Sequence, residues 1–148
     1  MTDEPAGSPP PRWFLKAFSS VHTCLYRLFG GRAFHRLGRW DMCLVTMTGA
    51  RSGRRRTLPL MWVPDGEAAL LVASQGGAPR HPQWYHNLVA HPEVEIEQGG
   101  RRSRLRARLL AGDERARAWR VCVEHYPPYE QYQRRTDREI PVFRCEPA

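Results

Sequence analysis

Arginines and glycines gather in one short stretch whose residue types suit an anion. Residues 48–59 read TGARSGRRRTLP, with four arginines close to Gly49 and Gly53. The glycines permit positive-φ backbone in which several N–H groups converge on an oxyanion. Arginine adds paired donors that match phosphate or carboxylate. A charged hairpin tip in solvent is the alternative, but its arginines would repel one another. The stretch therefore favours anion binding.

A second stretch suits a flat ring. Residues 74–87 read SQGGAPRHPQWYHN, in which Gly76 and Gly77 precede a helix that we expect to start near Pro82. A helix N-terminus behind glycines is a good anion site, and Trp84 and Tyr85 offer large planar surfaces. Alone, these two aromatic residues are more typical of a core. The glycine pair beside them indicates a ring site, although the dinucleotide fingerprint GxGxxG is absent.

Three tyrosines recur at every third position in residues 126–132, which read YPPYEQY. A phenol can donate a hydrogen bond to a carbonyl or nitro oxygen, or act as an acid. Tyrosine clusters also serve simply as packing, so this segment is weak evidence by itself.

The elements that must position these stretches are mostly strands. Apolar runs and alternation predict strands at 41–48, 57–63, 67–74, 93–97, 101–109 and 140–145, and helices at 81–90 and 113–125. The turn at 64–66 predicts a hairpin between the second and third strands. Hairpins with inserted helices indicate a mainly β, α+β fold with an antiparallel sheet or barrel.

The N-terminal part differs from the rest. Residues 1–11 are proline-rich and predict a disordered tail, residues 12–40 form an N-terminal segment with an amphipathic helix at 12–30, and residues 41–148 form the main domain. A basic amphipathic helix lies in a membrane interface or docks on a β core, and both alternatives stay open. An arginine row at 102–108 favours a solvated sheet face over an anion site.

Composition narrows the partners. The chain has 148 residues and a net charge of +8, which favours nucleic acid, an acidic membrane surface or an anionic small molecule. The cysteines, at positions 24, 43, 122 and 145, show no metal-ligand spacing and predict buried free thiols in a reducing cytosol. Since we find neither a secretory signal nor a membrane-spanning run, we expect a cytoplasmic protein without a metal.

Taken in order, these stretches resemble the deazaflavin (coenzyme F-420)-dependent nitroreductase family of actinobacteria. The resemblance covers residues 12–147 and is carried by residues 46–53, 56–59, 73–77, 81–88, 87–92, 126–132, 135–138 and 140–142. It implies a split β-barrel of the FMN-binding type, with antiparallel strands and flanking helices. It also implies an oxidoreductase that transfers hydride from C5 of reduced coenzyme F-420 to a quinone or another electron-poor acceptor such as a nitroaromatic.

The resemblance also implies residue roles. Tyr129 would be catalytic, orienting the acceptor oxygen and supplying a proton; substrate would lie near Tyr126, Tyr132, Met61 and Ser74. Coenzyme would be bound by Arg51, Ser52, Arg56, Thr57, Leu58, Pro59, Met61, Ala73, Ser74, Gln75, Trp84, Tyr85, Asn87 and Tyr129.

Two residues depart from the family pattern. Gln75 stands where lysine is common, and Met61 stands where a nitro-drug-activating member has tyrosine. The second departure weakens the expectation of prodrug reduction and leaves menaquinone-type quinones as the implied acceptors. A lipid-embedded quinone fits peripheral contact of residues 12–30 with the inner face of the plasma membrane.

Other functions remain possible at this point. A related split barrel could bind FMN or a tetrapyrrole instead. A basic nucleic-acid-binding module would explain the charge, but no recognised nucleic-acid-binding motif is present in the sequence.

Overall fold

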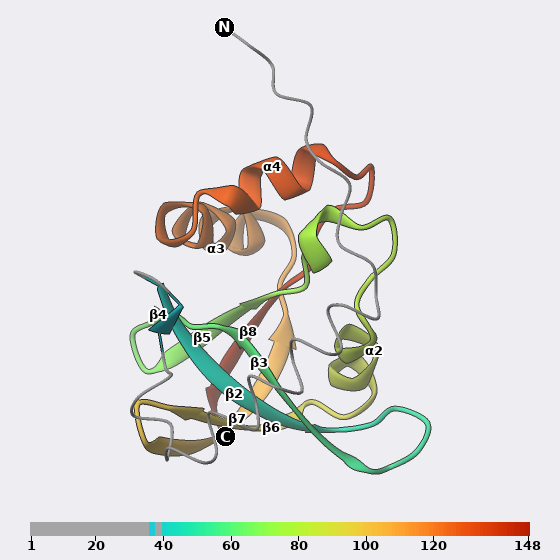
Figure 1. The fold of residues 1–148 in the computed structure, drawn as a ribbon, viewed down its shortest axis with the longest axis vertical. Helices are drawn as coiled ribbons and strands as arrows, with labels where there is room; N and C mark the ends of the chain where they lie inside the picture. The colour runs from blue at the N-terminus through green and yellow to red at the C-terminus, as the bar shows by residue number, and fades with distance from the viewer. Residues whose placement is uncertain (1–35, 38–39) are drawn as a thin grey trace, which may run out of the picture.

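The computed structural model describes residues 36–37 and 40–148 (Figure 1), and side chains are described from residue 41 onward. The predicted disordered tail at 1–11 and amphipathic helix at 12–30 lie outside these residues. No helix within the described residues is long and apolar enough to cross a membrane.

The described chain forms one antiparallel sheet with helices packed around it. The strands are β1 (Arg36–Leu37), β2 (Trp40–Thr48), β3 (Arg55–Met61), β4 (Val63–Asp65), β5 (Ala68–Val72), β6 (Glu93–Gln98), β7 (Arg101–Leu109) and β8 (Val142–Pro147). The helices are the short 3₁₀ turn η1 (Gln75–Gly77), α2 (Gln83–Ala90), α3 (Gly112–His125) and α4 (Pro128–Arg134).

Strand order shows how the sheet curls. The order is β1-β2-β6-β7-β8-β5-β4, and β3 pairs with β2 off this path. β3 also approaches β5, but no ladder joins these two strands among the described residues. The sheet thus curls back on itself and stays split between β3 and β5. The predicted mainly antiparallel α+β class is confirmed.

One predicted hairpin is corrected. The run at 57–63 was expected to pair with the run at 67–74, but β3 pairs with β2 from Met42↔Met61 to Thr48↔Arg55. Only the short β4 pairs with β5, from Val63↔Leu70 to Asp65↔Ala68. The chain changes partner at Trp62, whose backbone N–H donates to the Asp41 carbonyl at 3.0 Å. Apolar alternation continues through Trp62, so the sequence pattern does not mark this change.

The barrel core lies inside the curled sheet. Cys43, Val45 and Met47, alternate residues of β2, are fully buried there with residues from β5 and β8 such as Leu71 and Phe143. These three side chains share one face of the strand, as the period of two requires, while Met42 and Leu44 on the opposite face are buried as well. Burial raises the pKa of the buried thiols of Cys122 and Cys145 to about 12.

A second core lies between the sheet and the two C-terminal helices. Leu70 and Val72 of β5 face Cys122 of α3 and Tyr129 of α4, and Figure 1 shows α3 and α4 together at one end of the sheet. Because helices cover one face of β5 and the barrel core covers the other, every residue of this strand is buried. This explains why its sequence is a continuous apolar run rather than an alternating one.

The arginine row of β7 pairs with acidic neighbours. Arg106 Nη1 lies 2.7 Å from Glu93 Oε1 on β6, and Arg102 Nη2 lies 3.4 Å from Glu97 Oε2. Arg108 is hydrogen-bonded to Glu114 and to Glu146. Exposed pairs of this kind contribute at most about 1 kcal/mol each. They support the prediction of a solvated sheet face.

Candidate functional site

A cleft of about 1230 Å³ opens between the β2–β3 hairpin, η1, α2 and α4. All but two of the residues that the sequence predicts for the site line this cleft. The predicted residues that line it are Arg51, Ser52, Arg56, Thr57, Leu58, Pro59, Met61, Ser74, Gln75, Trp84, Asn87, Tyr126, Tyr129 and Tyr132. Segments far apart in the sequence thus meet along one surface.

The two exceptions lie behind this surface. Ala73 is fully buried in the barrel core. Tyr85 packs with its ring 5.7 Å from that of Phe143 and 4.1 Å from that of His81. Both support the cleft wall from inside. The lining also includes Gly49 and Pro82, which the sequence analysis singled out in their two stretches, and six residues that it did not indicate individually, namely Met42, Ala50, Leu60, Val72, Gln83 and His86.

The arginine loop closes on itself at one end of the cleft. Gly49 N–H donates to the Arg54 carbonyl at 2.8 Å, and Gly53 N–H donates to the Gly49 carbonyl at 3.0 Å. Ser52 Oγ accepts from Arg54 N–H at 3.2 Å. A Cβ on Gly49 would lie 2.6 Å from this Oγ, so a larger residue there would displace the Ser52 hydroxyl from its place in the loop.

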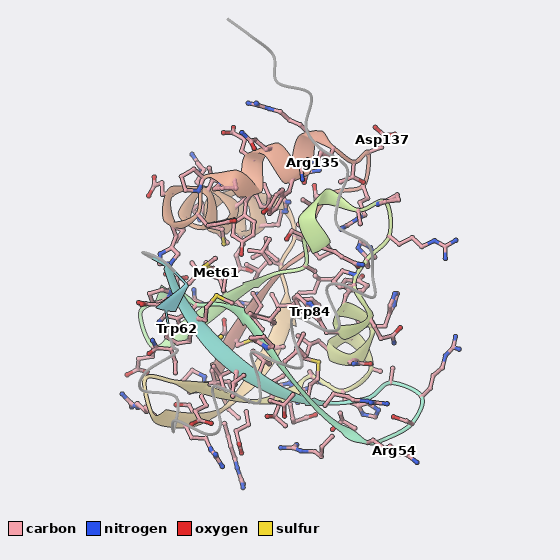
Figure 2. All side chains as sticks on the ribbon, in the orientation of Figure 1. Arg54, Met61, Trp62, Trp84, Arg135 and Asp137 are labelled. Atoms are coloured by element: carbon pink, nitrogen blue, oxygen red, sulfur yellow. The ribbon has the colours of Figure 1, made fainter. Side chains whose placement is uncertain are left out.

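The arginines of this loop divide into two sets. Arg51 and Arg56 line the cleft, whereas Arg54 and Arg55 do not. Figure 2 shows Arg54 at the tip of the hairpin, pointing away from the body of the protein. Residue types alone predicted one shared anion site, whereas the resemblance assigned only Arg51 and Arg56 to the coenzyme, and these are the two that line the cleft.

Asn87 ties α2 to the arginine loop. Its side chain is 5% exposed, and its Oδ1 accepts a hydrogen bond from Ala50 N–H at 2.9 Å. Its Nδ2 lies 3.8 Å from Met47 Sδ. Asn87 was expected to contact the coenzyme; the structure shows that it lines the cleft and positions the loop.

The glycine-rich loop at η1 has a backbone that few sequences can adopt. Gln75, Gly76 and Gly77 have φ values of 45°, 63° and 81°. A Cβ on Gly77 would lie 2.5 Å from the Tyr132 carbonyl oxygen. Glycine therefore serves both the left-handed conformation and the close approach of the loop to α4. This places Ser74 and Gln75 beside the tyrosines.

The tyrosines form the other end of the cleft. Tyr126 and Tyr132 hydroxyls lie 3.2 Å apart, and the Tyr126 and Tyr129 rings meet edge to face at 4.9 Å. All three residues lie in or just before α4, a helix that the sequence analysis missed because Pro127 and Pro128 suggested a break. Pro128 instead occupies its first turn, where proline is well tolerated.

Burial keeps the phenols of Tyr126 and Tyr129 protonated. Tyr129 is 5% exposed, and burial raises its pKa well above the ordinary 10.0. Burial and the hydrogen bond with Tyr132 raise the pKa of Tyr126 as well. At neutral pH the cluster can therefore donate hydrogen bonds to an acceptor oxygen.

Comparison with known proteins now decides the family. A model of the family described as "F420H(2)-dependent quinone reductase" matches residues 19–147. The chain belongs to this family. A curated family member of Mycobacterium tuberculosis with the same description is 42% identical over 126 residues, which cover 82% of this chain and 85% of that protein.

Two solved structures are also similar to this member of the quinone reductase family. An F420-H2 dependent reductase is 47% identical, covers 71% of this chain and 93% of its own, and has a TM-score of 0.67. A domain-swapped dimer is 42% identical, covers 86% of this chain and 97% of its own, and has a TM-score of 0.71. The expected family resemblance and split-barrel fold are confirmed.

The cleft suits the coenzyme that the family name states. Guanidinium groups at the arginine loop match a phosphate and an acidic tail. Apolar walls from Leu58, Pro59 and Trp84 match a planar ring. The cleft is also larger than the range usual for one drug-sized ligand, about 300–1000 Å³, which suits a coenzyme that carries a long tail. Among the described residues, no cluster of side chains could hold a metal ion.

Proposed function

We propose that this protein binds reduced coenzyme F-420 and a quinone side by side in the cleft and reduces the quinone. One arrangement supports the proposal: cations at one end of the cleft, apolar walls between, and protonated tyrosines at the other end. When bound, the reduced coenzyme supplies a hydride. The family description names the same pair of reactants.

The two ends of the cleft have separate tasks in this proposal. Arg51 and Arg56, with Ser52, bind the phosphate and acidic tail. Thr57, Leu58, Pro59 and Met61 contact the ring along β3, and Ser74, Gln75 and Trp84 contact it from η1 and α2. Holding both reactants in one cleft replaces a chance encounter with a fixed geometry.

Tyr129 is the proposed catalytic residue. Its buried hydroxyl stays protonated, so it can donate a hydrogen bond to a quinone oxygen as negative charge develops there. It can then supply the proton that completes a two-electron reduction. Tyr126 and Tyr132 flank the acceptor and hold each other through their hydroxyl contact.

Met61 favours quinones over nitroaromatics. It lines the cleft, and its thioether has no hydrogen to donate to a nitro oxygen. A tyrosine at this place would offer such a donor. We therefore propose menaquinone-type quinones as the natural acceptors.

A lipid-soluble acceptor motivates a finer proposal on location. We infer that residues 12–30 bring the protein to the inner face of the plasma membrane. Flotation with anionic vesicles tests this: the full chain should float, and a variant lacking residues 1–35 should not. Equal behaviour of the two proteins would refute it.

The main test compares ligands and then follows turnover. Oxidised coenzyme F-420, FMN and haemin are titrated against tryptophan fluorescence, and F-420 should bind most tightly. Reduced F-420 is then mixed with menadione, and the deazaflavin absorbance should return at a rate proportional to enzyme. Tighter binding of FMN or haemin, or no turnover with a panel of quinones, would contradict the proposal.

A further inference from the structure

Arg138 holds the glycine-rich loop from behind. It lies between α4 and β8, and none of the cleft lining comes from it. Its Nε donates to the Ala78 carbonyl at 2.9 Å, its Nη2 to the Ser74 carbonyl at 2.8 Å, and its Nη1 to the Ala73 carbonyl at 3.2 Å. One guanidinium therefore binds the residues before and after η1.

The loop needs such an external partner. Residues 75–77 all have positive φ. This conformation is costly for Gln75, the one residue of the three that has a side chain. Only two short backbone bonds close the loop internally, Gly77 N–H to Ser74 O and Ala78 N–H to Gln75 O. Arg135 Nη1 adds one bond to the Gly76 carbonyl at 3.1 Å. Most of the carbonyl groups of the loop thus depend on two arginines about 60 residues away in sequence.

His81 completes the same arrangement. Its Nδ1 lies 3.1 Å from Arg138 Nη1. A guanidinium has no acceptor, so Nδ1 must accept and the ring must be neutral, with its proton on Nε2. A protonated ring would place an N–H donor and a second positive charge against Arg138. The contact therefore exists only with neutral His81.

We propose that Arg138 is a positioning residue for the ring end of the cleft and that neutral His81 is part of the same clamp. Arg138 sets the path of residues 73–78, and through His81 it also sets the start of α2. Protonation of His81 loosens the loop and weakens ligand binding. The ligand part rests on the proposed function, whereas the clamp itself does not.

The surroundings of His81 also favour its neutral form. Burial, the charge of Arg138 and then His86 lower its pKa from 6.5. The rings of Tyr85 and His86 face it at centroid distances of 4.1 and 6.3 Å. A histidine whose folded-state pKa is lowered is disfavoured as a cation, so stability is fully present above 6.5 and is lost as pH falls below it.

The first arm of the test uses no ligand. Hydrogen exchange is measured by mass spectrometry in the wild type, Arg138→Lys and the control Arg134→Lys, an exposed arginine of α4. Lysine cannot reach three carbonyls at once. Amides of residues 74–81 should exchange about tenfold faster in Arg138→Lys, as expected for losing one charged hydrogen bond. Unchanged exchange there would overturn the clamp.

The second arm tests His81 by pH. Glutamine accepts a hydrogen bond but does not titrate, so His81→Gln keeps the contact at every pH. The wild-type thermal midpoint should fall relative to that of His81→Gln between pH 8 and pH 5. His91→Gln, at the far end of α2, should follow the wild type. A pH-independent difference would overturn the role of His81.

The third arm joins the clamp to binding. The ratio of the wild-type to the His81→Gln dissociation constant for F-420 should be near one at pH 8 and about fivefold at pH 5. Ionisation of the ligand is the same for both proteins and cancels in the ratio. A flat ratio would refute the link to binding. Absence of F-420 binding in the wild type would reject the proposed function, while the first two arms would still decide the clamp. If Arg138→Lys exchanges fast throughout the chain, the second arm decides it.

Discussion

Asn87 Oδ1 accepts a hydrogen bond from Ala50 N–H at 2.9 Å, which joins helix α2 to the arginine loop between β2 and β3. The two residues are separated by 37 positions. The loop carries the proposed phosphate site, and α2 carries Trp84 of the proposed ring site. The hydrogen bond therefore fixes the distance between these two parts of the proposed site.

Replacing Asn87 should therefore weaken both the fold and ligand binding. Asn87→Ala leaves the partly buried Ala50 N–H without its partner, which costs about 1 kcal/mol. We expect a lower free energy of unfolding in urea and roughly tenfold weaker F-420 binding. Val89→Ala, at an exposed position on the same helix, is the control and should change neither. An unaltered dissociation constant in Asn87→Ala would contradict the positioning role.

Substitutions of the loop arginines should affect F-420 binding differently, according to whether the arginine lines the cleft. Arg51→Gln or Arg56→Gln removes a guanidinium that lines the cleft and should weaken F-420 binding by about 10–100-fold, the range for hydrogen bonds to charged groups. The salt dependence of binding should also diminish. Arg54→Gln, at the hairpin tip, should bind as the wild type does. Equal losses in all three variants would indicate general attraction by the loop rather than a site.

Tyr129→Phe should lower turnover more than affinity. The hydroxyl interacts with charge that develops during reduction of the quinone, and a positioned acid contributes about 10²–10⁴-fold. We expect kcat with menadione to fall by about 100-fold or more, with a change in F-420 dissociation constant below threefold. Equal losses in both quantities would remove Tyr129 from the catalytic role.

The same hydroxyl makes a prediction about alkaline pH. Burial raises the pKa of Tyr129 well above 10.0, so the proton-donating form persists through pH 10, where an ordinary tyrosine is half ionised. The ratio of wild-type to Tyr129→Phe turnover should stay constant from pH 8 to pH 10. A ratio that halves near pH 10 would show a phenol of ordinary acidity.

Gly77 should be more sensitive than other left-handed glycines. Gly77 and Gly99 have φ values of 81° and 60°, but only a Cβ at Gly77 meets nearby atoms, at 2.5 Å from the Tyr132 carbonyl. Gly99→Ala should cost about 1–2 kcal/mol of unfolding free energy, the price of the left-handed backbone. Gly77→Ala should cost more and also weaken F-420 binding, because the loop must move from α4. Equal destabilisation would mean that the close contact relaxes freely.

Much of the fold could be predicted from local patterns. Alternation in residues 93–97 and 101–109 located β6 and β7 within a residue, because one face of each strand is buried and the other is solvated. Residue types and spacing marked the arginine, glycine and tyrosine stretches that meet at the cleft, and the resemblance named most of the individual lining residues. Residue types alone indicated only a flat, anionic ligand. The resemblance then identified the expected ligand as a deazaflavin.

What the sequence determined by itself was therefore the local elements, the residue types of the site and the family. The tertiary structure decided which strand β3 joins and that a helix follows Pro127. It also brought Arg138 to the carbonyl groups of residues 73–78, across 60–65 positions of sequence. Contacts of this kind depend on how distant segments pack, and no local period or motif encodes which carbonyl a remote guanidinium reaches.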